Sequence, residues 1–222
     1  MTVRVTREAE PQIELYGAYS GELLGGTQGT RSSLTFTPTD DYLIVVPKNQ
    51  VNYAQLEEAP TPSSYILTTT SSATRAGETL TIPSANLPYS ATAMSIAMEG
   101  TMDGANLTFV SWQEGADNLI SITSGASDFS FTQEAATVVD TVSGGSYTSG
   151  VNVPFSIASR HGSTFINGAV DGTALTENTT PVALPDLSTT DLNLGYDFMG
   201  TIKTFRMWAD DISDVGIEEA SS

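Results

Sequence analysis

The sequence predicts an all-β protein whose main part is a two-sheet jelly-roll sandwich. Short runs of valine, isoleucine, phenylalanine and tyrosine recur about every ten residues, with turn-forming residues between them. From residue 154 to residue 210 the pattern is strand, tight turn, strand. Helix signals are nearly absent, and the best one is a short serine-led turn from Ser213 to Ala220.

Residues 1–54 are expected to form an N-terminal extended β arm or a small β subdomain that anchors the protein. Strands are expected at residues 13–18, 33–37 and 42–46, and a glycine-rich stretch at 21–29 separates the first two. A segment with so few apolar side chains makes a poor core of its own. This part is therefore expected to pack on another body.

Residues 55–78 are predicted to be a connector rich in proline, threonine and serine. Pro60 and Pro62 hold the chain extended, because each fixes its own φ and biases the preceding residue away from helix. The threonine and serine tract at 68–74 is either an extended strand lying along a sheet or an exposed tether.

Residues 79–222 are predicted to form the jelly-roll domain itself. Alternation places Met94, Ile96 and Met98 on one face of a strand. Asn167-Gly168, flanked by apolar residues, predicts the turn of a hairpin. The expected strands are 79–82, 93–99, 107–113, 119–123, 128–132, 137–142, 153–159, 164–166, 192–196 and 201–208.

The net charge is −18, from 8 basic and 26 acidic side chains. Sequence-independent binding of nucleic acid depends on basic side chains, so this composition argues against it. The charge is uneven: residues 1–55 carry four basic and six acidic residues, a net of −2, and the remainder carries −16. Solubility is the simplest interpretation of the excess acid, and calcium loading is the alternative.

The chain has no cysteine, so a disulfide framework and thiolate metal sites are excluded and the redox compartment stays open. The first residues do not resemble a signal peptide. No stretch approaches the roughly 20 apolar residues of a membrane span, so membrane insertion is not expected.

Several motifs point to a known family. Residues 55–76 carry a glutamine-leucine-glutamate and, later, a threonine-arginine-alanine. Downstream come Phe165–Gly168, Leu192–Gly195, Gly200–Lys203 and Arg206–Trp208, followed by a serine-capped helix signal. Across about residues 55–215 the chain resembles structural proteins of tailed bacteriophages that carry a concanavalin A-like, laminin-G-like jelly roll.

The resemblance implies a non-enzymatic virion structural protein on the outer surface of a phage particle. It would be a homotrimeric head fibre or capsid decoration protein, with phage capsid or tail proteins as partners. The alternative is a tail-fibre or other adhesin module that recognises host-surface polysaccharide. Arg4 and Arg7 are the candidate anchoring residues, either in contact with an acidic particle surface or as solvated charges.

Catalysis finds little support in the sequence. The single histidine, His161, lies in a polar stretch from Ser159 to Ser163 and is expected in an exposed loop, and no G-x-S-x-G elbow occurs. The paired carboxylates of sandwich-fold glycosidases follow an E-x-D-x-x-E pattern, which is absent. Glu114 and Asp117 are the nearest acidic pair, and Gly115 between them suggests a turn.

Glycan binding would use exposed aromatic side chains. Tyr147 lies in a glycine- and serine-rich loop and is the best exposed candidate. Trp112 and Trp208 are the other candidates, although packing in a core or an interface is favoured for both. No cofactor is expected. Calcium is the metal that suits the predicted loops with Asp103, Asp117, Asp171 and Asp197, although aspartate in these contexts also simply forms turns.

Overall fold

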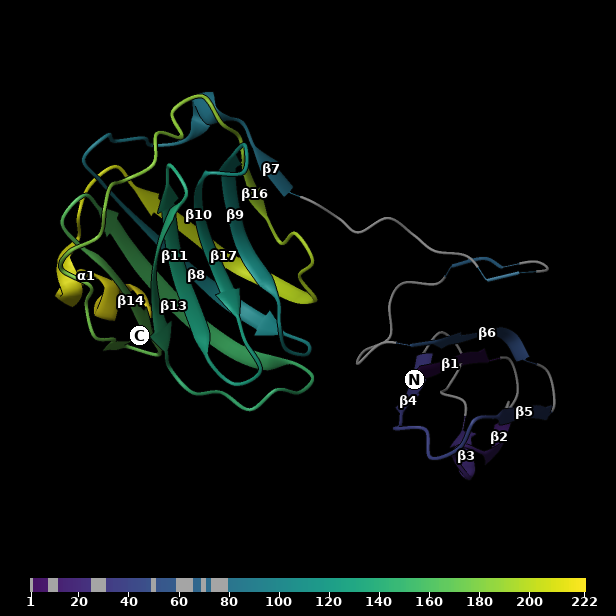
Figure 1. Cartoon of the computed structure of the whole chain (residues 1–222). Helices are drawn as coiled ribbons and strands as arrows, with labels where there is room; N and C mark the ends of the chain where they lie inside the picture. Colours follow the sequence, from purple (N-terminus) through teal and green to yellow (C-terminus); the bar gives the residue numbers. More distant parts are fainter. Residues whose placement is uncertain are drawn as a thin grey trace. The chain divides into compact units, whose positions relative to one another are not determined.

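The computed structural model describes residues 2–7, 12–24, 31–48, 51–58, 66–68, 71–72 and 80–222. The chain divides into two compact units, Met1–Ala76 and Gly77–Ser222 (Figure 1). Every strand pairing among the described residues is antiparallel. No helix among them is long and apolar enough to cross a membrane.

The described residues of the N-terminal unit form two three-stranded sheets. Ile13, Leu15 and Phe36 form its small buried cluster, and the Tyr19 ring lies 4.7 Å from that of Phe36. Residues 55–57, which the sequence analysis assigned to the connector, belong to the last strand. One sheet runs β4 (Arg31–Thr35), β1 (Thr2–Arg7), β6 (Val51–Glu57). The other runs β3 (Gly21–Leu24), β2 (Gln12–Gly17), β5 (Leu43–Lys48).

The C-terminal unit is a sandwich of a six-stranded and a five-stranded sheet. The prediction of an all-β, two-sheet sandwich of jelly-roll type is therefore confirmed. The six-stranded sheet runs β12 (Val138–Gly144), β11 (Phe129–Ala135), β10 (Asn118–Ser124), β9 (Thr108–Glu114), β16 (Leu192–Leu194), β7 (Leu80–Ile82). The five-stranded sheet runs β15 (Thr173–Ala174), β14 (Ile166–Val170), β13 (Val153–Gly162), β8 (Ala93–Met102), β17 (Gly200–Trp208).

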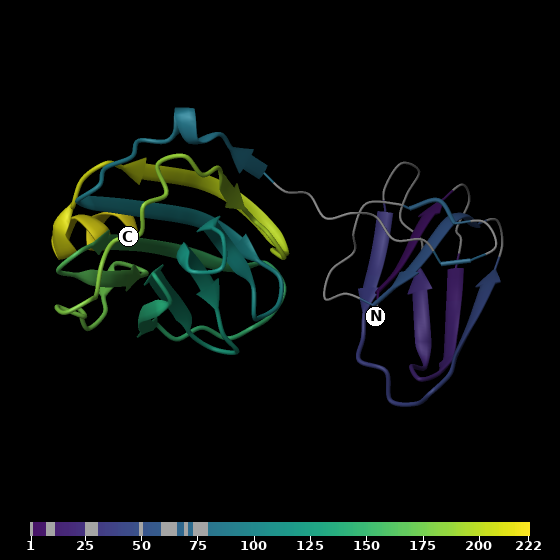
Figure 2. The ribbon, with the colours of Figure 1, turned by 45° about the horizontal axis from the view of Figure 1, so that its top comes forward.

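Two short helices complete this unit: the 3-10 helix η1 (Ser84–Asn86) and α1 (Ser213–Ala220), which matches the predicted helix. Figure 2 shows the sandwich as two layers, with α1 against the layer that contains β8 and β17. The helix therefore covers part of one outer face of the sandwich.

The core lies between the two sheets. Met94, Ile96 and Met98, which were predicted to share one face of a strand, point into it, whereas Ala97 on the same strand belongs to a separate cluster under α1. Trp112 is fully buried, and its indole nitrogen donates to the Thr190 carbonyl at 2.7 Å. Both sheets are thus fixed by apolar residues at every second position of their long strands.

The predicted Asn167-Gly168 turn is wrong, because both residues lie inside β14. A Cβ added to Gly168 would meet the Phe131 ring at 2.1 Å, so this glycine lets an aromatic ring of the facing sheet approach the backbone. The tight turn comes instead at Asp171-Gly172, where both residues have positive φ (48° and 75°). Aspartate followed by glycine suits this turn, which joins β14 to β15.

β17 forms one edge of the five-stranded sheet. Its pairing with β8 shifts register between Ile202 and Thr204, which is a bulge in this edge strand. Lys203, at the bulge, places its Nζ 2.6 Å from Oε1 of Glu99.

Candidate binding surface

The C-terminal helix packs on part of the outer face of the five-stranded sheet. Ile217 of α1 is fully buried against Ala97, Ala158 and Ala169, three small side chains that let the helix approach the strands. Trp208 is partly buried beside this cluster. This contact removes much of the outer face of β8, β13 and β14 from any ligand.

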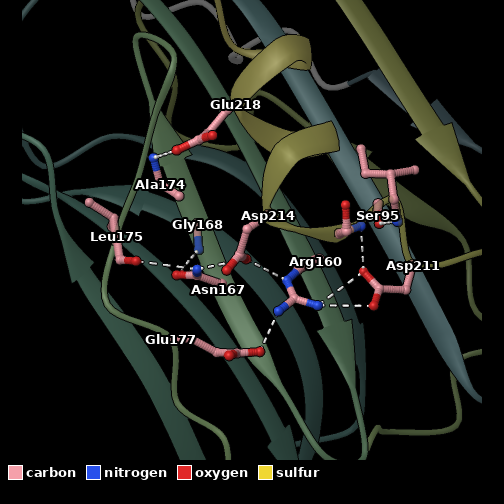
Figure 3. Close-up of polar contacts among 12 residues, drawn as sticks. Ser95, Arg160, Asn167, Gly168, Ala174, Leu175, Glu177, Asp211, Asp214 and Glu218 are labelled. Carbon is pink, nitrogen blue, oxygen red and sulfur yellow. Dashed lines mark hydrogen bonds and ion pairs between the residues drawn. The ribbon is translucent and has the colours of Figure 1, made fainter.

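Arg160 of β13 pairs with three carboxylates, one of which, Asp214, belongs to α1 (Figure 3). Its Nε donates to Asp214 Oδ1 at 2.8 Å, its Nη1 to Asp211 Oδ2 at 2.9 Å, and its Nη2 to Glu177 Oε1. The guanidinium carbon also lies 4.4 Å from the centre of the Phe165 ring. Because each guanidinium nitrogen has a carboxylate partner, this group is a structural clamp.

Asn167 extends the clamp into β14. Its Nδ2 donates to Asp214 Oδ1 at 2.9 Å and to the Leu175 carbonyl at 3.3 Å, and its Oδ1 accepts from the Gly168 amide at 2.9 Å (Figure 3). The asparagine that suggested a hairpin turn is therefore buried and holds the start of α1.

The outer face of the six-stranded sheet has a different character. Aligned positions on four neighbouring strands face the core, and these are Ile82, Leu192, Trp112 and Ile120. The residue adjacent to each of them along its strand, on the same side of the register, therefore faces outward. One row of outward residues, each paired with the next in register, crosses all six strands. This first row is Thr81, Asn193, Ser111, Ser121, Thr132 and Thr141.

A second row crosses four strands beside the first, and consists of Thr108, Thr123, Ser130 and Ser143. We call the two rows together the hydroxyl face. All ten side chains are partly or fully exposed, nine of them carry a hydroxyl group, and none is charged. The next position along β11 is Glu134, so the uncharged area ends there.

Part of the hydroxyl face is ordered by contacts between neighbouring strands. Thr132 and Thr141 share a hydrogen bond of 3.0 Å, Ser130 and Ser143 one of 2.8 Å, and Thr81 donates to Asn193 at 2.9 Å. Within the described part of the chain, four hydroxyls of this face form no side-chain hydrogen bond and can donate and accept outward. These belong to Thr108, Ser111, Ser121 and Thr123.

The predicted aromatic platforms lie elsewhere. Trp112 has no exposed surface, so its prediction as an exposed glycan platform is wrong and the core alternative holds. Trp208 packs beside α1. Tyr147 was expected to be exposed but is partly buried: its hydroxyl donates to the Gly125 carbonyl at 2.6 Å, and its ring lies 5.1 Å from Phe129.

The candidate anchoring residues Arg4 and Arg7 lie in β1, where Arg4 pairs in register with Ser33 and Gln55. Their side chains lie outside the described residues. The backbone position alone places both arginines in the central strand of a three-stranded sheet.

The prediction that His161 lies in an exposed loop is wrong. β13 continues to Gly162 and pairs on both sides, so His161 is a fully buried strand residue. Its Nε2 lies 3.0 Å from Ser159 Oγ, and burial lowers the pKa of His161 to about 3. The imidazole is therefore neutral at physiological pH and is enclosed in the sandwich.

The acidic loop residues mostly serve the turns. Asp103 accepts a hydrogen bond from the Asn152 amide at 2.6 Å, and Asp171 and Asp197 adopt positive φ. Among the described residues, no group of three or more histidine, cysteine, aspartate or glutamate side chains could hold a metal ion. Glu114 and Asp117 are both exposed in the hairpin between β9 and β10.

No family model matches the sequence, and no curated protein matches it either. Among solved structures, the binding domain of botulinum neurotoxin serotype D has a TM-score of 0.51 at 13% identity, covering 65% of this chain and 40% of that one. A mutant of a protein designated HCR/D has a TM-score of 0.51 at 10% identity, with 64% and 39% covered. The chain thus spans about two fifths of these proteins. Identities this low show similarity of fold alone.

Proposed function

We propose that the protein is a non-enzymatic binding module whose C-terminal sandwich recognises a polysaccharide through the hydroxyl face. The observation that carries this proposal is the alignment of ten uncharged, hydrogen-bonding side chains on one exposed sheet surface. Saccharides present many hydroxyls, and serine and threonine hydroxyls both donate and accept hydrogen bonds. A rigid sheet holds such groups at fixed positions, which lowers the entropy lost on binding.

The contrast between the two outer faces supports this choice of surface. α1 and the Arg160 clamp cover part of the outer face of the five-stranded sheet, whereas no helix packs on the hydroxyl face among the described residues. The neurotoxin protein with the similar fold is itself a binding domain. That similarity supports a binding role for the sandwich and leaves its ligand open.

The N-terminal unit is proposed to attach the sandwich to a larger body. Residues 1–76 hold five basic and eight acidic side chains, a net of −3, whereas residues 77–222 hold three and eighteen, a net of −15. Tyr16, Tyr42 and Ile44 are exposed on this unit. Low charge and exposed apolar side chains suit a unit that docks.

The motifs of residues 55–215 support a phage particle as that body, with the protein displayed on its outer surface as a homotrimer. Attachment to the head as a fibre or decoration protein is the first proposal, and attachment to the tail as an adhesin is the second. The second draws support from the hydroxyl face, since an adhesin needs a binding surface. Electron microscopy of particles carrying the full chain distinguishes the two positions, and a chain lacking residues 1–76 should be absent from both.

Binding is tested with the full chain and a panel of soluble polysaccharides by affinity electrophoresis. We expect at least one polysaccharide to retard the protein saturably, without release of reducing ends. The variant Ser121→Ala/Thr132→Val should reduce this retardation, and Thr201→Val, at an exposed threonine on β17, should keep it. If no polysaccharide in the panel binds, or if reducing ends accumulate, the proposal fails.

A further inference from the structure

We infer that the ligand of the hydroxyl face is a neutral, extended polysaccharide chain that runs across the strands. This inference rests on the proposed function and adds the charge and the direction of the ligand. It follows from three features of the sandwich: the position of its basic side chains, the spacing of the first row and the absence of aromatic groups from the two rows.

Charge disfavours an anionic ligand. The unit from Gly77 to Ser222 has three basic side chains against eighteen acidic ones. All three lie in the five-stranded sheet: Arg160 is enclosed by carboxylates, Lys203 pairs with Glu99, and Arg206 is on β17. A uronate or sulfate group on the hydroxyl face would therefore meet the negative field of the unit without a cation to pair with it.

Spacing sets the direction of the ligand. The first row presents one polar side chain on each of six adjacent strands, about 4.8 Å apart, and so extends over about 24 Å. This spacing is close to the length of one sugar residue in an extended chain. Along the strands the face is only two rows deep. A polymer crossing the strands can therefore offer a hydroxyl to each side chain of the row in turn.

The two rows contain no aromatic ring, so sugars cannot stack there as they do on exposed tryptophan. Recognition then depends on many hydrogen bonds, each of which contributes little in competition with water. Affinity should therefore rise with the length of the saccharide until the chain spans the first row. Short oligosaccharides of the same sugar are expected to bind weakly.

The test uses the full chain and pairs of polymers that share a backbone, namely hydroxyethylcellulose with carboxymethylcellulose and dextran with dextran sulfate, besides neutral galactomannan and mixed-linkage β-glucan. We expect a neutral polymer to bind, and any charged derivative of it to bind about tenfold more weakly at low salt, with the gap narrowing as salt is added. Ser121→Ala/Thr132→Val should weaken the neutral complex about fivefold or more. Thr201→Val should leave it unchanged, and thermal melts should show that both variants fold.

The outcomes separate this inference from the proposed function. If a charged polymer binds as well as its neutral partner or better, and the face variant weakens it, the function stands and neutrality of the ligand is overturned. If affinity does not rise with saccharide length, the crossing geometry is overturned. If binding is indifferent to the face variant, or no polymer binds, the hydroxyl face itself is rejected as the site.

Discussion

His161 is enclosed in the interior of the sandwich, where its imidazole meets Ser159 and has no compensating negative charge among its hydrogen-bond partners. The neighbouring polar side chain, Gln133, donates to the Gly162 and Ala183 carbonyls at 3.0 and 2.9 Å. Protonating the imidazole would place a charge in an apolar region, so burial lowers its pKa to about 3.

This burial predicts that acid destabilises the protein through His161. The unfolded chain takes up a proton near pH 6.5 and the folded chain only near pH 3, so stability falls as the pH drops through this window. The limiting slope is about 1.4 kcal/mol per pH unit. Urea unfolding between pH 7 and pH 4 should show a shallower pH dependence in His161→Leu than in the native chain. Equal slopes in the two proteins would contradict the assignment.

The close approach of the Phe131 ring to Gly168 predicts that a single added methyl group lowers the stability of the protein. In Gly168→Ala the new methyl group would overlap the Phe131 ring, so the variant should lose about 1–3 kcal/mol of unfolding free energy. Gly150→Ala is the matched control, because its nearest neighbour would lie at an ordinary 3.4 Å from the new carbon. Chemical denaturation of both variants measures the difference. Similar stabilities would mean that the Phe131 ring moves aside at little cost.

Single residues were the least predictable part of the molecule. Trp112, Tyr147 and His161 each lie in a sequence context that permits either a surface or an interior position. The outcome depends on which strands pair with which neighbours and on where each strand ends. β13 continues three residues beyond the predicted end, and those residues include His161.

At the scale of elements, α1 depends on the Arg160 clamp. Arg160→Leu would leave Asp211, Asp214 and Glu177 close together without a cation, so we expect a loss of about 3 kcal/mol and faster amide exchange in residues 213–221. Lys203→Ala breaks an exposed pair and should change stability far less. Hydrogen exchange followed by mass spectrometry compares the amide exchange of residues 213–221 in the two variants. Protection of α1 that survives in Arg160→Leu would show that the apolar contact of Ile217 suffices.

Most strands of the sandwich could be predicted from alternation, because large apolar residues recur at every second position in β8, β10 and β11. The hydroxyl face was missed for a related reason. The serines and threonines between those apolar residues are visible in each strand, but the rows exist only once the register across six strands is known. The Asn167-Gly168 pair misled because the rule for hairpin turns is local, whereas Phe131 and Asp214 reach this pair from distant parts of the sequence.

At the scale of the whole molecule, the two units differ in how much core each contains. The large cluster of buried side chains lies entirely within residues 77–222, whereas the described part of the N-terminal unit buries a cluster of three large side chains. A fragment of residues 77–222 should therefore fold alone and melt within about 5 °C of the same unit in the full chain. Circular dichroism melts test this expectation. A fragment without a cooperative transition would show that the sandwich needs its neighbour.

The bulged edge of β17 restricts how copies of the protein can associate. A strand offered by another molecule needs a straight, regularly spaced series of amides and carbonyls, and the shift between Ile202 and Thr204 interrupts that series. Lys203 adds a charge that would have to be desolvated if a strand of another molecule paired with this edge. Copies of the protein at high concentration are therefore less prone to pair along this edge into a continuous sheet.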